Sequence, residues 1–450
     1  MSQSSHDSHS HHQSRDLIQH DATGDGIDRR GFLRCRAWAG TGMLWAREGG
    51  VLSSRALART PGDAASTSAA DLFFVQISDS HIGFAKDPNH DVAATLGEAV
   101  RRINGLPSEP AFLLHTGDIS QLSKPEEFDA AQQIIAGAHT RSGDVHYVPG
   151  EHDVLDGSGK LYLERYGRKA RGQGWYSFDY RGVHFVGLVN VLDLKPGGLG
   201  NLGREQLEWL NSDLKGYSAS TPVVVFAHVP LWTVYPAWGW GTDDSQQALG
   251  YLRRFGSVSV LNGHIHQVMQ KVEGNVTFHT AMSTAFPQPV PGTAPSPGPM
   301  PVQAERLRDL LGLASVSFTR GHKHLAVVDS TMSGVSLATA QAEWRPYVAN
   351  GAGAAGGSAA GAEATAAAPG TIAIANFTFA PTMLHVRAGD TITFTNGDDT
   401  AHRIASADGS FKPSAALDTD ETFHLKLTRP GTYRYFCSIH PQMQGTIEVR

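Results

Sequence analysis

Cysteine is almost absent from this chain, which has 2 cysteines among its 450 residues. Two thiols cannot build the disulfide framework of a small secreted scaffold, so that class of protein is excluded. Positive charge is not in excess either, because the formal net charge is -6 at pH 7. This balance argues against a partner such as nucleic acid, which is bound by neutralising its phosphates. Chemistry on a phosphate group would therefore need local cations, and we expect these to be metal ions.

Long apolar runs are also missing near the N-terminus. The run at residues 37–46 falls short of the about 20 apolar residues that a membrane-spanning helix needs, so we expect no stable membrane span. It follows Arg29 and Arg30 in the motif Arg-Arg-Gly-Phe-Leu-Arg, and small residues come later at 56–58. This order resembles a twin-arginine export signal and implies a periplasmic or otherwise extracytoplasmic protein. The alternative is an arginine pair at the start of a surface helix.

The remaining composition divides the chain into four parts. Residues 1–58 are predicted to be a disordered leader and export signal, and residues 349–370 an Ala/Gly-rich linker. Two globular domains are expected at residues 71–345 and 371–450, in keeping with a length well above that of one domain. If the leader is cleaved near residue 58, Cys437 is the only thiol of the mature chain.

The first domain alternates short apolar runs with helical patterns. We predict helices at residues 91–104 and 125–136. We predict strands at residues 72–77, 111–115, 145–148, 222–227, 325–330 and 335–340. Such alternation is typical of a layered α/β domain whose ligands lie at the carboxyl ends of its strands.

Histidine is plentiful, with 22 residues, and several histidines stand beside carboxylates at these strand ends. The motifs, in chain order, are Asp79-Ser80-His81, Gly117-Asp118, Gly150-Glu151-His152-Asp153, His228 and Gly263-His264-Ile265-His266. Carboxylate oxygen and imidazole nitrogen suit Mn, Fe and Zn, and a shared carboxylate makes a two-metal site.

This ordered set strongly resembles the calcineurin-like metallophosphoesterase superfamily, over residues 71 to about 345. The resemblance implies a layered α/β sandwich and hydrolysis of phosphate esters. It implies that one ion is held by Asp79, His81, Asp118 and His266, and a second by Asp118, Glu151, His228 and His264. It further implies that His152 is the acid for the leaving group and that Asp153 orients its ring.

Position 151 departs from the superfamily pattern, which has Asn where this chain has Glu151. A carboxylate still binds a metal, but it adds negative charge beside an anionic substrate. We therefore expect altered metal preference and reduced or redirected turnover, with a site that only binds metal as the alternative. Motif spacing and the segment 206–210 resemble class III cyclic-nucleotide phosphodiesterases.

Two further segments of this domain leave alternatives open. The aromatic segment 231–240 forms a wall over the site or simply packs its own loop. The proline-rich segment 286–301 forms a lid or, as we expect, a passive surface insertion.

The C-terminal domain has short β patterns. Strands are predicted at residues 371–379, 384–386, 391–395, 422–427 and 431–437, which indicates a small all-β sandwich or barrel. Its candidate metal ligands are His402, Cys437, His440 and Met443. Two imidazoles, one thiolate and a weak axial thioether are the ligands of a blue-copper site.

The spacing Cys437-x2-His440-x2-Met443 resembles the cupredoxin family, and amicyanin-like loops in particular. The resemblance implies a Greek-key sandwich, one copper ion and electron transfer with a redox partner. A copper-free cupredoxin-like module is the alternative.

Together these patterns predict an exported phosphoesterase that hydrolyses phosphate mono- or diesters at two Mn, Fe or Zn ions and carries a tethered copper domain. The competing hypothesis is a copper-binding or electron-transfer protein whose phosphoesterase domain is weakened by Glu151.

Overall fold

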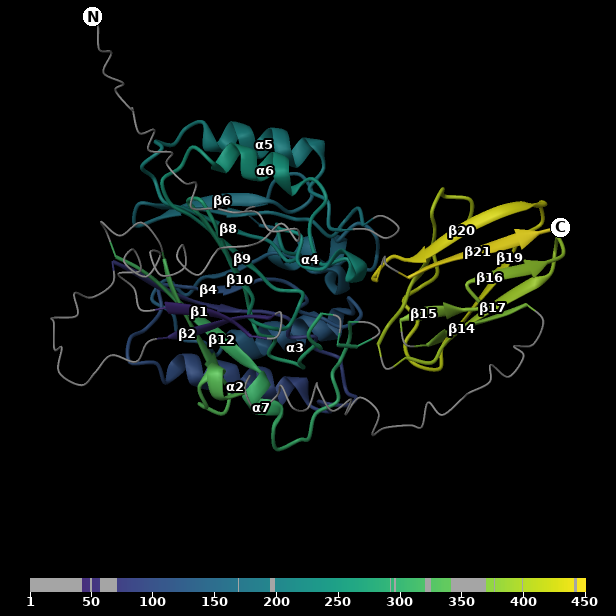
Figure 1. The fold of residues 1–450 in the computed structure, drawn as a ribbon, viewed down its shortest axis with the longest axis horizontal. Helices are drawn as coiled ribbons and strands as arrows, with labels where there is room; N and C mark the ends of the chain where they lie inside the picture. The colour runs from purple at the N-terminus through teal and green to yellow at the C-terminus, as the bar shows by residue number, and fades with distance from the viewer. Residues whose placement is uncertain are drawn as a thin grey trace, which may run out of the picture. The chain divides into compact units, whose positions relative to one another are not determined.

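The computed structural model (Figure 1) describes residues 71–340 and 370–450, apart from positions 169, 195–198, 292, 295–296, 320–324, 376, 399 and 441–442. It also describes the backbone at 43–48 and 51–56. The predicted arginine motif and the Ala/Gly-rich linker lie outside the described residues. The chain divides into a unit of residues Met1–Ser68 and a unit of residues Ala69–Arg450.

In the first unit, β1 (Met43–Glu48) and β2 (Val51–Ala56) pair antiparallel. The second unit contains the elements described below. Among the described residues, no helix is long and apolar enough to cross a membrane.

One sheet of the second unit has five strands in the order β13-β12-β3-β4-β5. β3, β4 and β5 run parallel, and β12 is antiparallel to β3. The bounds are β3 Leu72–Ile77, β4 Leu113–His115, β5 Val145–Tyr147, β12 Gly312–Phe318 and β13 Ala326–Thr331. β3 is a nearly continuous apolar run because both faces of a covered parallel sheet are buried.

A second sheet has six strands in the order β10-β11-β9-β8-β7-β6. Its four central strands are parallel and its two edge strands are antiparallel. The bounds are β6 Tyr176–Tyr180, β7 Val183–Gly187, β8 Val223–Phe226, β9 Val258–Asn262, β10 Gln270–Glu273 and β11 Val276–Thr280.

Helices cover the outer face of each sheet, as Figure 1 shows. One apolar cluster joins α2 and α3 to the five-stranded sheet, and another joins α5 and α6 to the six-stranded sheet. The α-helices are α2 Val92–Asn104, α3 Pro125–Ile135, α4 Lys160–Tyr166, α5 Arg204–Leu214, α6 Ser245–Leu252 and α7 Leu307–Leu310, and the 3₁₀ turns are η1 Glu151–Asp153 and η2 Pro236–Trp238.

The inner faces of the two sheets share a third apolar cluster, which is rich in phenylalanine. Phe112 of the five-stranded sheet region is stacked on Phe74 at 5.0 Å and meets Phe185 of the other sheet edge-on at 5.3 Å. Helix, sheet, sheet and helix therefore form four layers, and the predicted layered α/β sandwich is confirmed.

The structure differs from the sequence prediction at residues 335–340, which were expected to form a strand. Residues 337–340 are helical instead. The Ser336 hydroxyl accepts a hydrogen bond from the Thr339 N–H at 3.2 Å, and the Ala340 N–H donates to the Ser336 carbonyl at 3.0 Å. Serine in this position caps a helical turn, and this local interaction outweighs the β pattern.

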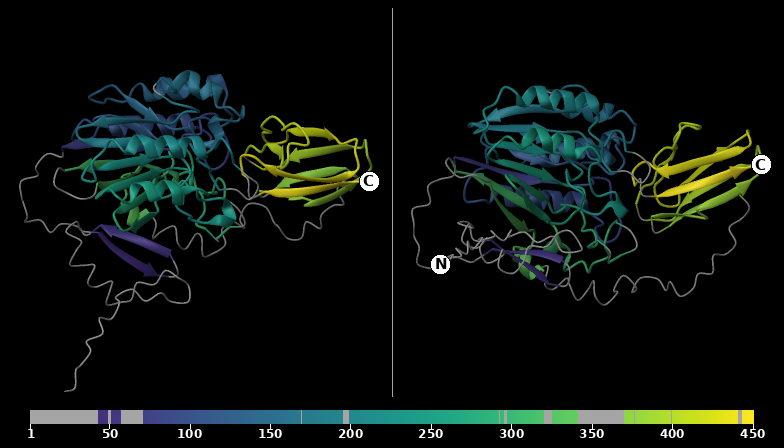
Figure 2. Two further views of the ribbon diagram at one scale, coloured as in Figure 1. Left: turned by 90° about the horizontal axis from the view of Figure 1, so that it is seen from above. Right: turned by 45° about the horizontal axis from the view of Figure 1, so that its top comes forward.

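The C-terminal part is a sandwich of two four-stranded sheets, drawn in light green and yellow in Figure 2. Their orders are β15-β14-β17-β19 and β16-β21-β20-β18. The bounds are β14 Thr371–Ala375, β15 Thr378–Ala380, β16 Met383–Val386, β17 Thr391–Asn396, β18 Ile404–Ser406, β19 Thr422–Lys426, β20 Gly431–Cys437 and β21 Gln444–Val449.

The predicted all-β sandwich is thus confirmed, with two refinements. The expected strand 371–379 divides into β14 and β15 around Phe377, whose φ is 55°. β18 and β21 were not predicted, and each pairs with β20.

We expect Phe112→Ala to lower the free energy of unfolding by about 3–5 kcal/mol, because Phe112 is 1 % exposed between the two sheets and its loss leaves a cavity. Urea denaturation followed by tryptophan fluorescence measures this change. The matched control is Val328→Ala, since Val328 is 58 % exposed and should change stability by no more than about 0.5 kcal/mol. Equal stability of the two variants would contradict this account of the core.

Candidate functional site

The predicted ligands of the first domain lie in tight turns at the carboxyl ends of the strands. Five of them have left-handed backbone, with φ values between 42° and 72°: Asp79, His81, Asp118, His264 and His266. Non-glycine residues seldom adopt this conformation, and such strain gathers at functional sites. The turns aim carboxylates and imidazoles from separate strands at one point.

Two glycines make room for this convergence. A Cβ at Gly117, whose φ is 99°, would collide with the His228 ring. A Cβ at Gly150 would collide with the Asp118 carboxylate. Side chains at either position would therefore push a predicted ligand out of place.

The first group of ligands consists of Asp79, His81 and His266. The Nε2 atoms of His81 and His266 lie 3.2 Å apart, and His266 Nε2 is 3.4 Å from Asp79 Oδ1. The opposite nitrogens are occupied, since His81 Nδ1–H donates to Gln121 Oε1 at 2.9 Å and His266 Nδ1–H to the Phe286 carbonyl at 2.7 Å. Each ring therefore presents the lone pair of Nε2 to the same point, as a metal ligand requires.

The second group consists of Glu151, His228 and His264. The Glu151 carboxylate lies between the two rings, with Oε2 3.0 Å from His228 Nε2 and Oε1 2.8 Å from His264 Nδ1. His228 Nδ1–H donates to the Thr116 carbonyl at 2.7 Å, which leaves Nε2 as the ligating atom. The Glu151 carboxylate therefore lies beside both imidazoles of this group, where it could ligate a metal ion together with them.

Asp118 connects the two groups. Its Oδ2 atom lies 3.5 Å from His81 Nε2 in the first group and 3.3 Å from His228 Nε2 in the second. Its other oxygen, Oδ1, accepts the His152 backbone N–H at 2.9 Å, which fixes the carboxylate. One carboxylate shared by two ligand groups is the arrangement of a two-metal site.

Buried atoms without hydrogen-bond partners mark the same place. Among the described residues these include Asp79 Oδ2, Glu151 Oε2, His228 Nε2 and His264 Nδ1. Each buried polar atom left unpaired costs about 1–3 kcal/mol. Cations would satisfy all four atoms at once, so the residues present fit two metal ions bound by oxygen and nitrogen.

The ionisation of these groups also suits metal binding. Burial, aided by the charge of Asp118, raises the pKa of Asp79 to about 7. Burial lowers the pKa of His81 to about 4 and so keeps its imidazole neutral at pH 7. Burial alone would raise the pKa of Glu151, but the neighbouring His264 and His228 hold it well below its usual range. A cation at this point would take over the role of these protons.

His152 lies beside the first group, with its ring centroid 4.8 Å from that of His81. Its Nδ1–H donates to the Gln121 carbonyl at 2.8 Å, which leaves Nε2 for proton transfer. The structure therefore gives the orienting role to the Gln121 carbonyl and not to Asp153. The Asp153 carboxylate instead accepts the backbone N–H groups of Ile119, Ser120 and Gly150 at 2.9–3.1 Å, and holds two loops together.

Gln121 is the functional residue that the sequence reasoning overlooked. Its side chain orients the ligand His81 and its carbonyl orients His152. Its place three residues after Asp118, in the loop that follows a predicted strand, is the signal by which the sequence could have identified it.

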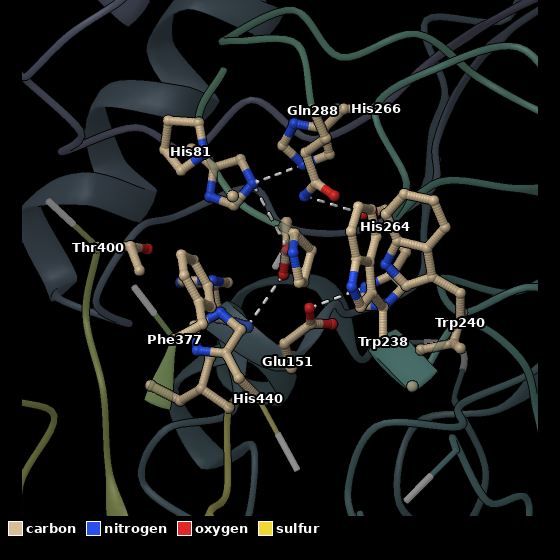
Figure 3. Close-up of a pocket in the computed structure, with 18 of the residues that line it drawn as sticks. His81, Glu151, Trp238, Trp240, His264, His266, Gln288, Phe377, Thr400 and His440 are labelled. Atoms are coloured by element: carbon tan, nitrogen blue, oxygen red, sulfur yellow. Dashed lines mark hydrogen bonds and ion pairs between the residues drawn. The ribbon is translucent and has the colours of Figure 1, made fainter. Parts of the chain in front are cut away.

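A pocket opens over these groups, and Figure 3 shows its lining. Trp238 and Trp240 stand on one side, edge to face with ring centroids 5.0 Å apart. The proline-rich segment contributes Gln288 and residues 297–299 to the lining, so it is not a passive surface insertion. The aromatic segment thus supplies a wall, although Trp232 packs into the core of the six-stranded sheet.

The second predicted metal site lies within the C-terminal sandwich. His402 Nδ1 and His440 Nδ1 are 3.6 and 3.8 Å from Cys437 Sγ and 3.3 Å from each other. Cys437 and Met443 are buried, and the Cys437 N–H donates to the Met443 carbonyl at 3.1 Å. The thiol and both imidazoles therefore meet at one point, next to the methionine.

Hydrogen bonds arrange this second site. The backbone N–H groups of Arg403 and His440 lie 3.4 and 3.3 Å from Cys437 Sγ and donate to it. His402 Nε2–H donates to Asp398 Oδ2 at 2.9 Å, which fixes Nδ1 as the ligand. Burial would lower the pKa of His402, but Asp398 and Cys437 raise it to about 9. Burial would raise the pKa of Cys437, but His402 and the two N–H donors lower it. A thiolate and two imidazole nitrogens fit copper.

Two family models match the chain. The model described as calcineurin-like phosphoesterase matches residues 74–268, and the model described as cupredoxin-like domain matches residues 351–449.

Curated relatives match each part separately. A 3′,5′-cyclic-nucleotide phosphodiesterase of Nostoc sp. is 28% identical over 42% of this chain and 67% of its own length. The glycerophosphodiester phosphodiesterase GpdQ of Enterobacter lignolyticus is 25% identical over 48% of this chain and 79% of its own length. Amicyanin-alpha of Methylorubrum extorquens is 32% identical over 17% of this chain and 69% of its own length.

We expect copper-loaded protein to show an intense thiolate-to-copper absorption at about 600 nm. Cys437→Ser should abolish this band, because it removes the thiolate. Met443→Leu is the matched control, since it preserves side-chain size in the core and removes only the weak axial ligand, so the band should shift but persist. Visible spectra of the three proteins test this assignment. A copper-loaded wild-type protein without the band, with the Cys437 thiol intact, would contradict it.

Proposed function

Because the chain joins a calcineurin-like phosphoesterase domain (residues 74–268) to a cupredoxin-like domain (residues 351–449), we propose an exported, metal-dependent phosphodiesterase with a tethered type 1 copper site. The observation that carries this proposal is the shared Asp118 Oδ2 atom, which faces a ligand histidine of each group at 3.3–3.5 Å. The two ligand groups that share Asp118 would hold two metal ions, which would supply Lewis-acid activation of a phosphoryl oxygen and of water.

The residues around this centre divide the remaining work. His152, held by the Gln121 carbonyl at 2.8 Å, would donate a proton from Nε2 to the leaving alkoxide. The Asp153 carboxylate keeps the His152 loop against the Asp118 loop through its backbone hydrogen bonds. Proton donation at this position favours loss of a poorly acidic alcohol, as in alkyl esters.

Glu151 bears on the choice of metal. With Asp79 and Asp118 it gives the centre three carboxylates beside four histidines. Carboxylate oxygens suit Mn, and imidazole suits Fe as well as Zn. We therefore propose Mn or Fe in this centre.

The pocket bears on the substrate. The relatives of this chain include enzymes named for cyclic nucleotides and for glycerophosphodiesters. Trp238 and Trp240 place aromatic surface beside His264 (Figure 3), and such surface packs against an apolar group or a base. We propose a phosphate diester in which at least one substituent is apolar or aromatic.

The catalytic proposal is tested by hydrolysis of bis(p-nitrophenyl) phosphate with added Mn²⁺. We expect wild-type protein to be active, and Asp118→Ala to lower kcat/KM by at least about 10²-fold, because it removes the ligand common to both ions. Asp129→Ala is the control, because Asp129 pairs with Arg165 on an exposed surface.

Glu151→Asn separates the two functions that the sequence left open. We expect it to retain hydrolysis and to shift the preferred ion away from Mn²⁺, because an amide is a weaker ligand for a hard cation than a carboxylate. If neither wild type nor Glu151→Asn shows metal-dependent hydrolysis, the enzyme proposal fails. A copper-binding protein with a weakened phosphoesterase domain is then the better description.

Export is proposed from residues outside the described part of the structure. We expect a protein with both Arg29→Lys and Arg30→Lys to remain in the cytoplasm, because twin-arginine export reads the arginine pair. Arg47→Lys is the matched control for a lost arginine elsewhere in the leader. Cell fractionation with immunoblotting measures the distribution, and normal export of the double variant would contradict the proposal.

A further inference from the structure

Residues of the C-terminal sandwich line the pocket over the first metal centre. They are Phe377, Thr400, Ile439 and His440. Figure 3 shows Phe377, Thr400 and His440 in the same pocket as His81, Glu151 and His264. The pocket is therefore completed by the copper domain.

Polar and apolar contacts join the two domains around this pocket. The Lys86 ammonium of the first domain lies 2.6 Å from Asp418 Oδ1 of the sandwich and also contacts the Thr419 hydroxyl. Leu122 and Leu155 of the first domain pack against the apolar core of the sandwich. Leu122 directly follows Gln121, so the interface begins next to the residue that orients both His81 and His152.

His440 belongs to both sites. Its Nδ1 atom faces Cys437 and His402 within the copper-ligand group. Its ring centroid is 6.1 Å from that of His152, the proposed acid. The same ring thus contacts the copper position on one side and the phosphoesterase pocket on the other.

Phe377 packs edge-on against the His440 ring. Its centroid is 4.8 Å from that of His440 and 5.3 Å from that of His402, edge-on in both cases. Its backbone N–H donates to Asp398 Oδ2, the oxygen that also accepts from His402 Nε2. A displacement of Phe377 by a ligand would therefore reach both copper-ligating histidines.

From this arrangement we propose that Phe377, Ile439 and His440 form one wall of the phosphate-binding pocket, so that an anion bound there and the copper site influence each other through His440 and Phe377. The inference rests on the proposed function in taking this pocket as the place where phosphate binds. Any change that phosphate causes in copper affinity must be matched by an equal change that copper causes in phosphate affinity.

The test uses full-length protein with Cu²⁺ in the copper site and Zn²⁺ in the first centre. Zn²⁺ is chosen because it contributes neither visible absorption nor an EPR signal. Inorganic phosphate is titrated while the absorption at about 600 nm and the copper EPR spectrum are recorded. We expect a saturable spectral change whose half-point matches the phosphate concentration that half-inhibits hydrolysis. By reciprocity, copper loading should change that inhibition constant about fivefold.

Lys86→Glu provides the decisive variant, because it places like charges at the contact with Asp418 without touching either metal site. We expect it to keep phosphate inhibition and to lose at least about half of the spectral change. Lys86→Glu combined with Asp418→Lys should recover the change, since the pair is restored in reverse. Lys160→Glu is the control, because the exposed Lys160 ammonium lies 3.8 Å from Glu164 Oε1 of the same helix.

Three outcomes would overturn the inference or its premise. Phosphate inhibition without any spectral change would reject the coupling between the pocket and the copper site, and would leave the proposed phosphodiesterase activity standing. A spectral change that persists in Lys86→Glu would indicate direct binding of phosphate to copper and would also reject it. If phosphate neither inhibits nor changes the spectrum, and no hydrolysis is seen, the proposed function itself fails.

Discussion

The proposed two-metal site depends on one carboxylate that faces both ligand groups. Asp118 presents Oδ2 to a histidine of each ligand group, while Oδ1 is held by the His152 backbone N–H. Gly150 has no side chain because Asp118 occupies the space that its Cβ would need. The left-handed turn at Asp118 and the adjacent Gly117 allow the carboxylate to reach this position. The position of the carboxylate therefore depends on the backbone conformation of this loop.

This concentration of buried polar groups is stable only with cations or protons among them. The side chains of Asp79, Asp118 and Glu151 are buried, so their negative charges repel one another with little screening by solvent. Protonation reduces part of this repulsion, since burial raises the pKa of Asp79 to about 7. Metal ions would reduce it more completely, and they would also satisfy Asp79 Oδ2, a buried oxygen without a hydrogen-bond partner among the described residues.

The sequence was sufficient to point to the candidate metal ligands. These candidates could be predicted because each follows a strand, and parallel strands bring their carboxyl ends together. It was insufficient for roles carried by the backbone. The orientation of His152 by the Gln121 carbonyl depends on the path of a loop, which no residue pattern encodes. Likewise β18 has only three residues, Ile404–Ser406, and is defined by its pairing with β20 rather than by a pattern of its own.

Contacts between domains were the least predictable feature, because they depend on shape and charge across segments far apart in sequence. Lys86 and Asp418 are unremarkable surface residues until the fold brings them together at 2.6 Å. A partly exposed ion pair contributes about 1 kcal/mol, so this pair alone would not hold two separate proteins together. Within one chain the requirement is smaller, since a tether supplies an effective concentration of roughly millimolar. A weak interface is then enough to hold His440 beside His152. Because the interface is weak, Phe377 and His440 could shift when the pocket binds a ligand.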